Sequence, residues 1–150
     1  GDATLLFNQY DYDRLGYFNV IISGTLGNLT TAQITEVEVL VELIKAAGVI
    51  GTVSQTTYKP VDIEVTPTID AGYDSTTVKS NIETALEDYL NGLDIGEDVL
   101  VASIIAASMG VEGVTNVVLD NLQFSSGSPG TSDLTVAVTE NATVGDITVN

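Results

Sequence analysis

A long alternating segment over residues 57–70 constrains the fold more than any other part of the chain. Val61, Ile63 and Val65 alternate there with polar residues. A period of two is typical of a β-strand that has one face in a core and the other in water. This stretch therefore predicts a long, half-buried strand.

Two prolines, Pro60 and Pro67, bracket the regular part of this segment. Because proline has no N–H to donate to a neighbouring strand, they predict an edge strand, or a strand that pairs only between them. Residues 71–75 then offer turn chemistry and a helix N-cap. We expect the strand to feed directly into a helix.

The first half of the chain combines one helix with short strands. Residues 17–23 and 49–57 are predicted strands, and Thr30 is predicted to cap the helix with Gln33 as its capping-box partner. We interpret this helix as a core-packing element. Its apolar positions recur at helical spacing and are Ile34, Val37, Leu40, Val41 and Ile44.

The second half begins with helices and ends with strands. A helix is predicted from Asp74 or Ser75 to about Asn91, and a second one over residues 102–109. A strand over 115–124 follows, and a loop over 125–132 that has no apolar residue. The last two predicted strands are short and occupy residues 134–138 and 146–149.

These elements predict an α+β fold of two small lobes, each with helices packed on a short mixed or antiparallel sheet. We expect an irregular N-terminal segment at 1–16, a first lobe at 17–72 and a second lobe at 73–150. Residues 11–16 carry an incomplete calcium-loop pattern, but the twelfth position is Ile22 instead of a bidentate glutamate. We interpret it as a turn.

The composition excludes several classes of function. The chain has no Cys and no His, so thiol chemistry, histidine catalysis and Cys/His metal sites are not expected, and we predict no cofactor. The net charge is −17 and the basic residues number only four. Contacts with nucleic acid or with an anionic membrane surface are therefore not expected.

Carboxylates are the remaining chemistry, and Asp62 and Glu64 would share one face of the long strand. Paired acids are a feature of glycoside hydrolases. A solvated strand face gives the same pattern, and no aromatic residues accompany the pair to stack on a sugar. We therefore predict that the chain is not an enzyme.

Four short motifs recur in an order that resembles the C-terminal part of the baseplate J-like family. They are a Pro-Val-Asp strand at 58–65, an acidic turn into a helix at 72–74, an Ile-Gly-Glu turn at 93–99 and a Gly-Val segment at 110–114. The resemblance covers about residues 17–150. Family members are wedge proteins of contractile phage tails and related injection machines, and they are usually longer, with an N-terminal portion that this sequence does not include.

The resemblance implies a structural protein of a contractile-tail baseplate, with no catalytic residues to carry over. Its expected partners are other baseplate or tail proteins and a second copy of itself, as a dimer within a ring. The expected location is the virion, after assembly in the host cytoplasm. A secreted or surface binding module for a carbohydrate or protein ligand remains the alternative.

Two segments are candidate interfaces. The 102–109 helix is almost free of charge and has small residues on every side, so we expect it to be buried either within this fold or against a partner that approaches closely. The 125–132 loop could be inserted between neighbouring subunits. The candidate interface residues are Ala102, Ile105, Ala106, Met109, Ser126 and Pro129.

Overall fold

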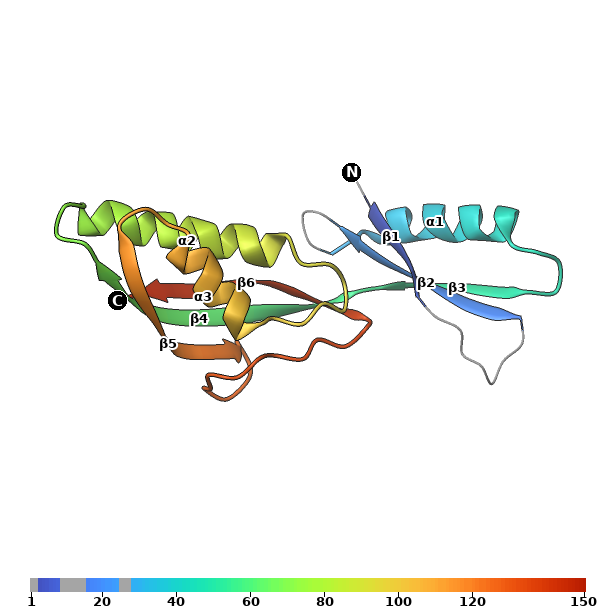
Figure 1. Ribbon diagram of the computed structural model, residues 1–150. Coiled ribbons are helices and arrows are strands. Elements are labelled where there is room, and N and C mark those ends of the chain that lie inside the picture. Colours follow the sequence, from blue (N-terminus) through green and yellow to red (C-terminus); the bar gives the residue numbers. More distant parts are fainter. Residues whose placement is uncertain (1–2, 9–15, 25–27) are drawn as a thin grey trace. The chain divides into compact units, whose positions relative to one another are not determined.

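The computed structural model describes residues 3–8, 16–24 and 28–150 and divides into two compact units, Gly1–Thr57 and Tyr58–Asn150 (Figure 1). The elements are β1 (Ala3–Asn8), β2 (Tyr17–Gly24), α1 (Thr31–Ile44), β3 (Ile50–Gln55), β4 (Thr57–Ile69), α2 (Ser75–Asn91), α3 (Val101–Met109), β5 (Val114–Phe124) and β6 (Glu140–Val149).

The N-terminal unit is a three-stranded sheet, in the order β1-β2-β3, with α1 on one face (Figure 1). β1 is antiparallel to β2, whereas β3 is parallel to β2 because α1 provides the crossover between them. Gly51 lets the helix lie close to the sheet, since a Cβ at this position would lie 2.7 Å from both Phe18 and Val41.

The C-terminal unit is built on a second three-stranded sheet, in the order β5-β4-β6. β5 is antiparallel to β4, with Ile63 opposite Leu122. β6 runs in the same direction as β4 (Figure 1). The N–H of Asn150 donates to the Val65 carbonyl at the end of this pair.

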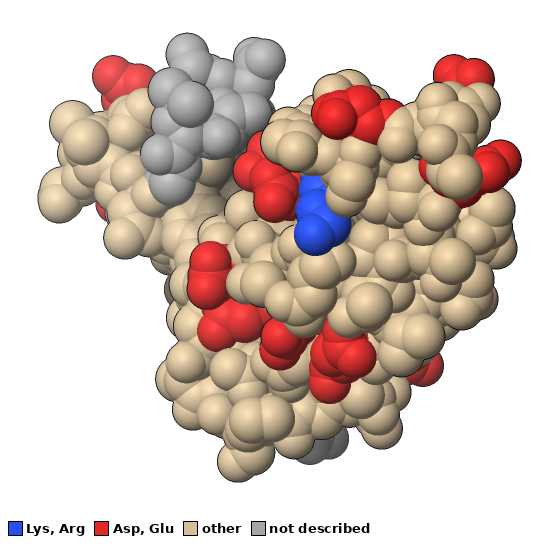
Figure 2. Space-filling model, turned by 90° about the vertical axis from the view of Figure 1, so that its left-hand side faces the viewer, with Lys and Arg blue, Asp and Glu red and all other residues tan. Residues whose placement is uncertain are grey.

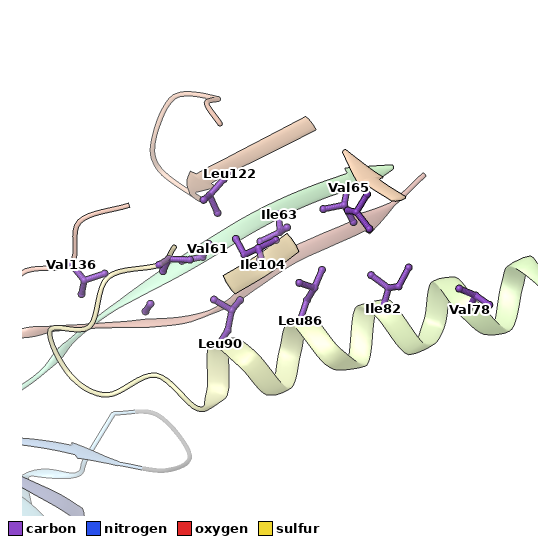
Figure 3. Close-up of a cluster of buried hydrophobic side chains, with 13 residues drawn as sticks. Val61, Ile63, Val65, Val78, Ile82, Leu86, Leu90, Ile104, Leu122 and Val136 are labelled. Atoms are coloured by element: carbon purple, nitrogen blue, oxygen red, sulfur yellow. The ribbon is translucent and has the colours of Figure 1, made fainter. Parts of the chain in front are cut away.

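Helices α2 and α3 enclose the core of this unit against the sheet. Val78, Ile82, Leu86 and Leu90 of α2 recur at helical spacing, and their side chains point toward β4 in Figure 3. Ile104 of α3 is completely buried in the same cluster. The buried side chains that β4 contributes are those of the alternating series, Val61, Ile63 and Val65.

The α+β class and the capping signals are confirmed. Thr30 and Gln33 form a complete capping box at the start of α1. The Asp74 side chain accepts a hydrogen bond from the Thr77 N–H at the start of α2. Both caps occupy donors that have no partner within the helix, which explains why the short local motifs mark these ends correctly.

The prediction of an edge strand, or of a strand that pairs only between its prolines, was wrong. β4 is the central strand, and its pairing with β5 continues past Pro67 to Ile69. Pro60 lies where β5 ends, and Pro67 lies where β6 ends. The Pro60 carbonyl accepts from Ser125, the residue directly after β5. Pro67 shares an edge of β4 with Val65, whose carbonyl accepts from Asn150, the residue directly after β6, so Pro67 follows the last backbone hydrogen bond between these two segments.

Three further expectations differ from the structure. Residues 3–8 of the expected irregular segment form β1, whereas 9–15, which hold most of the incomplete calcium-loop pattern, lie outside the described residues. The expected strand at 134–138 is only a single bridge between Val99 and Leu134, and β6 begins at Glu140. The units divide at 57/58 and not near 72, because β4 pairs with β5 and β6.

Candidate interaction surfaces

The predicted interface residues of α3 lie on the outward side of that helix. Ala102, Ala106 and Met109 are exposed and follow one another at helical spacing, while Ile105 is half-buried beside them. The opposite side carries Ile104 in the core. The outward face of α3 is therefore an uncharged surface of small residues with Met109, which is 41% exposed, at its end.

Ser126 and Pro129 are exposed in the loop that follows β5. The loop is held back against β5, because the Gly130 N–H donates to Asn121 Oδ1 and the Gly130 carbonyl accepts from the Leu122 N–H at 2.6 Å. These bonds give the loop a defined course along the edge of the sheet.

The two candidate segments are connected through Asp133. Its carboxylate accepts from the N–H of Val101, the first residue of α3, at 2.8 Å. Val99 and Leu134 exchange backbone hydrogen bonds beside this contact. The end of the loop is thus attached to the start of α3, whereas Met109 lies at the far end of the helix, about 12 Å along its axis.

The acidic pair on β4 takes part in contacts between strands. Asp62 Oδ1 accepts from Ser125 Oγ at 2.5 Å and from the Asp146 N–H at 3.0 Å. Glu64 accepts from the Asn150 side chain at 2.9 Å. The hydrogen bond from Ser125 is the largest of the effects that lower the pKa of Asp62, which keeps this carboxylate ionised.

Gly145 passes directly over Asp62, where a side chain would not fit. A Cβ at Gly145 would lie 2.5 Å from Asp62 Oδ1 and 2.7 Å from the Val61 carbonyl oxygen. The same glycine brings the Asp146 N–H to the carboxylate. The described part of the chain has no group of three or more acidic side chains placed to hold a metal ion. The contacts of Asp62 with Ser125 and Asp146 join β4 to the end of β5 and to β6.

The surface is strongly acidic. Figure 2 shows acidic side chains spread across one face, with basic side chains covering only a small part of it. Lys59 forms an ion pair with Glu140 at 3.3 Å and lies over the Phe124 ring, and Lys45 contacts Glu42 at 2.7 Å. In the described chain no helix is long and apolar enough to cross a membrane.

An apolar surface on α1 was not predicted from the sequence. Leu40 and Ile44, which were expected to pack in the core, are 58% and 73% exposed. Val39 and Leu43 are exposed beside them at 54% and 75%. We call Val39, Leu40, Leu43 and Ile44 the α1 stripe. The signal was present, since apolar residues at both 39/40 and 43/44 cover more than one side of a helix.

One family matches most of the C-terminal unit. The family model described as Baseplate J-like protein C-terminal domain matches residues 61–150. This range lies within Tyr58–Asn150, and it begins at the first buried valine of β4. No curated protein matches the chain.

A solved structure is similar over both units. It is a chain of the six-fold symmetrised cryo-EM structure of the anti-feeding prophage (AFP) baseplate, with a TM-score of 0.65 and 15% sequence identity. The match covers 95% of the present chain and 33% of the other one. The present chain thus spans about a third of the length of that relative. At this identity the likeness establishes a shared fold.

Proposed function

The chain belongs to the family of the Baseplate J-like protein C-terminal domain, and we propose that it is a structural component of a contractile-tail baseplate that acts through protein–protein interfaces. The observation that carries the proposal is the family match over residues 61–150. The likeness of fold to a chain of a baseplate structure, over 95% of this chain, supports it.

The proposed role is not enzymatic. The acidic pair that most resembled a catalytic site, Asp62 and Glu64, accepts hydrogen bonds from β6 and from the residues after β5 and β6. A carboxylate such as Asp62, which is held ionised by hydrogen bonds from Ser125, Asp146 and Gln123, is a poor general acid near neutral pH. These side chains fit a role in holding three strands in register.

The proposed interface has two parts, the outward face of α3 and the loop after β5. Ala102, Ala106 and Met109 present a smooth uncharged face, with Ile105 at its border, on which a partner's backbone or helix could pack closely. Ser126 and Pro129 lie on the loop. We propose other baseplate or tail proteins as partners, together with a second copy of the chain as a dimer within a ring.

The proposed location is the tail baseplate of a virion, with assembly in the host cytoplasm. Because the chain carries a net charge of −17, neighbouring copies repel one another unless cations or basic partner surfaces intervene. We therefore expect assembly to strengthen with salt where acidic surfaces meet and to weaken with salt where a basic partner is bound. Association that is unchanged from low to high salt would contradict this expectation.

Sedimentation of native material, followed by electron microscopy of the fast fraction, tests the proposed function. We expect the chain to travel with sheathed tails or ring-shaped plates. A chain that stays at the size of a monomer or dimer, in a source without such particles, would favour a binding module for a carbohydrate or protein ligand.

The α3 surface is tested by Ala106→Arg. A long charged side chain on this face should prevent close packing and reduce incorporation into the particle, while the isolated chain folds normally because residue 106 is exposed. Ala71→Arg is the matched control, since Ala71 is an exposed alanine in the turn before α2. Equal incorporation of both variants would remove α3 from the proposed interface.

A further inference from the structure

The α1 stripe is a continuous apolar surface on a helix whose other side is already packed. Ile34, Val37 and Val41 face the N-terminal sheet, with Val41 only 6% exposed. On the outward side, Val39 and Leu43 are one helical turn apart, as are Leu40 and Ile44. Helices that are apolar on two sides are typically covered on both sides by protein.

A shallow hollow beside the stripe contains an acidic side chain, Glu36. Thr35, Glu36, Val39 and Leu40 line the hollow, which is open to solvent. Hollows between successive helical ridges are the places that accept side chains from a facing helix. Glu36 therefore lies within the apolar surface, where its carboxylate would meet the occupant directly.

Acidic groups accompany the stripe along its length. Glu36, Glu38 and Glu42 are all exposed on α1. The nearest lysine in sequence, Lys45, contacts Glu42 at 2.7 Å, so that its charge is already engaged. An occupant with Lys or Arg beside its apolar residues would be complementary to this surface, and an acidic occupant would be repelled.

A second copy of this chain fits the stripe poorly. Two α1 helices facing each other would bring their glutamates together, and each copy carries a net charge of −17. The stripe consists of four partly exposed aliphatic side chains on one helix, whereas a specific interface buries roughly 800 Å² on each partner. The apolar area alone is too small to offset this repulsion.

We propose that the α1 stripe is the docking surface for an amphipathic helix of another protein, one whose apolar residues are flanked by lysine or arginine. The apolar anchors fill the ridge and hollow of α1, and the basic flanks pair with Glu36, Glu38 and Glu42. This inference goes beyond the baseplate assignment and does not depend on it, because it rests on the exposure and charge of α1 alone.

The probe is a synthetic helical peptide with a leucine stripe flanked by lysines, titrated into the full chain and followed by backbone amide NMR. The matched peptide carries glutamate in place of each lysine. We expect the lysine peptide to shift amide signals along α1 and to lose affinity as salt is raised. The glutamate peptide should leave these signals unchanged.

Variants of the chain locate the contact. Leu43→Gln and Ile44→Gln should each weaken binding of the lysine peptide about tenfold, because each removes an apolar anchor from the contact. Ile50→Gln is the control, since Ile50 is 61% exposed in the same unit but lies on β3, outside the stripe. All three residues are exposed, so the fold should be unaffected.

Three results would overturn the proposal. The first is no shift on α1 with the lysine peptide, and the second is equal binding of the glutamate peptide. The third is self-association of the chain in sedimentation equilibrium that Leu43→Gln abolishes and Ile50→Gln does not, which would identify a second copy as the occupant. None of these readouts depends on particle assembly, so they are separate from the test of the baseplate function.

Discussion

The two units of this molecule differ in how completely they cover their apolar residues. In the C-terminal unit, two helices enclose one face of the sheet, and Ile63, Ile82 and Leu86 are at most 1% exposed. In the N-terminal unit, α1 buries Val41 but leaves Leu43 and Ile44 at 75% and 73% exposure. The C-terminal unit thus covers its own core, whereas the N-terminal unit retains an exposed apolar surface on α1 that a binding partner can cover.

The family match follows the same division. It covers residues 61–150, which lie within the C-terminal unit. A family model can only describe what its members share, and the part shared here is the part with a complete core of its own. The N-terminal unit, which lies outside the match, carries the α1 stripe. The family model thus describes the C-terminal unit, whereas the likeness of fold to a chain of the baseplate structure extends over both units.

Removing a large core side chain should have the largest effect on stability and tests whether the two units unfold separately. Leu86→Ala removes a completely buried side chain of α2 and should lower the free energy of unfolding by about 2–5 kcal/mol. Residue-level NMR during denaturant titration should show this loss in the C-terminal unit alone. Leu43→Ala is the control and should change stability by less than about 0.5 kcal/mol. A loss shared equally by both units would show that they unfold as one.

A methyl group at Gly145 should have the next largest effect. Its Cβ would lie within 2.7 Å of both Asp62 Oδ1 and the Val61 carbonyl oxygen, and the second of these is backbone that cannot rotate away. Gly145→Ala should therefore cost about 1–3 kcal/mol, measured by denaturant unfolding of the C-terminal unit. Gly130→Ala is the matched control, because the nearest atom to its Cβ would lie 3.8 Å away. Equal losses would contradict the steric explanation.

Local sequence signals predicted the elements well where short-range chemistry decides them. The capping box of Thr30 and Gln33 marks the start of α1, and Asp74 marks the start of α2. The apolar residues of α2 recur at helical spacing, and four of them, Val78, Ile82, Leu86 and Leu90, are buried. These features depend on residues three or four apart, so their physical basis is contained within one segment of sequence.

Features that depend on distant segments were not predictable in the same way. The prolines of β4 indicated an edge strand, and only the positions where β5 and β6 end explain why a central strand tolerates them. The hydrogen bonds of Asp62 come from residues 125 and 146, more than 60 positions away. Likewise, the helical spacing of α1 gives its apolar residues, but the side that the sheet covers depends on β2 and β3.

The hydrogen bonds of Asp62 should make the stability of the C-terminal unit depend on pH in the acid range. Because hydrogen bonds from Ser125 and Asp146 lower its pKa in the folded state, ionised Asp62 stabilises the fold above its unfolded pKa of about 4. This contribution disappears as the pH falls through the lower, folded pKa. Asp62→Asn should cost about 1 kcal/mol near pH 7.

Urea titrations of the wild type and Asp62→Asn at several pH values measure this effect. The difference between the two proteins should shrink as the pH falls below about 4. Asp94→Asn, at an exposed aspartate in the turn after α2, is the control and should lower stability much less than Asp62→Asn. If the difference in free energy of unfolding between the wild type and Asp62→Asn is constant with pH, the charge of Asp62 does not contribute to stability.

The helix caps give the smallest effects and the finest comparison between the units. Thr30→Ala and Asp74→Ala each remove a side-chain acceptor from a helix N-terminus, and Thr30→Ala should cost about 0.5–1 kcal/mol. The two substitutions should differ in how many residues of the helix lose protection from hydrogen exchange. Helix α2 is held by four buried side chains, so Asp74→Ala should raise hydrogen exchange only in its first turn. Helix α1 has Val41 as its buried anchor, so Thr30→Ala should raise exchange over several turns. Thr30→Ser, which keeps the acceptor, should restore protection; exchange confined to one turn in both helices would mean that α1 is held as firmly as α2.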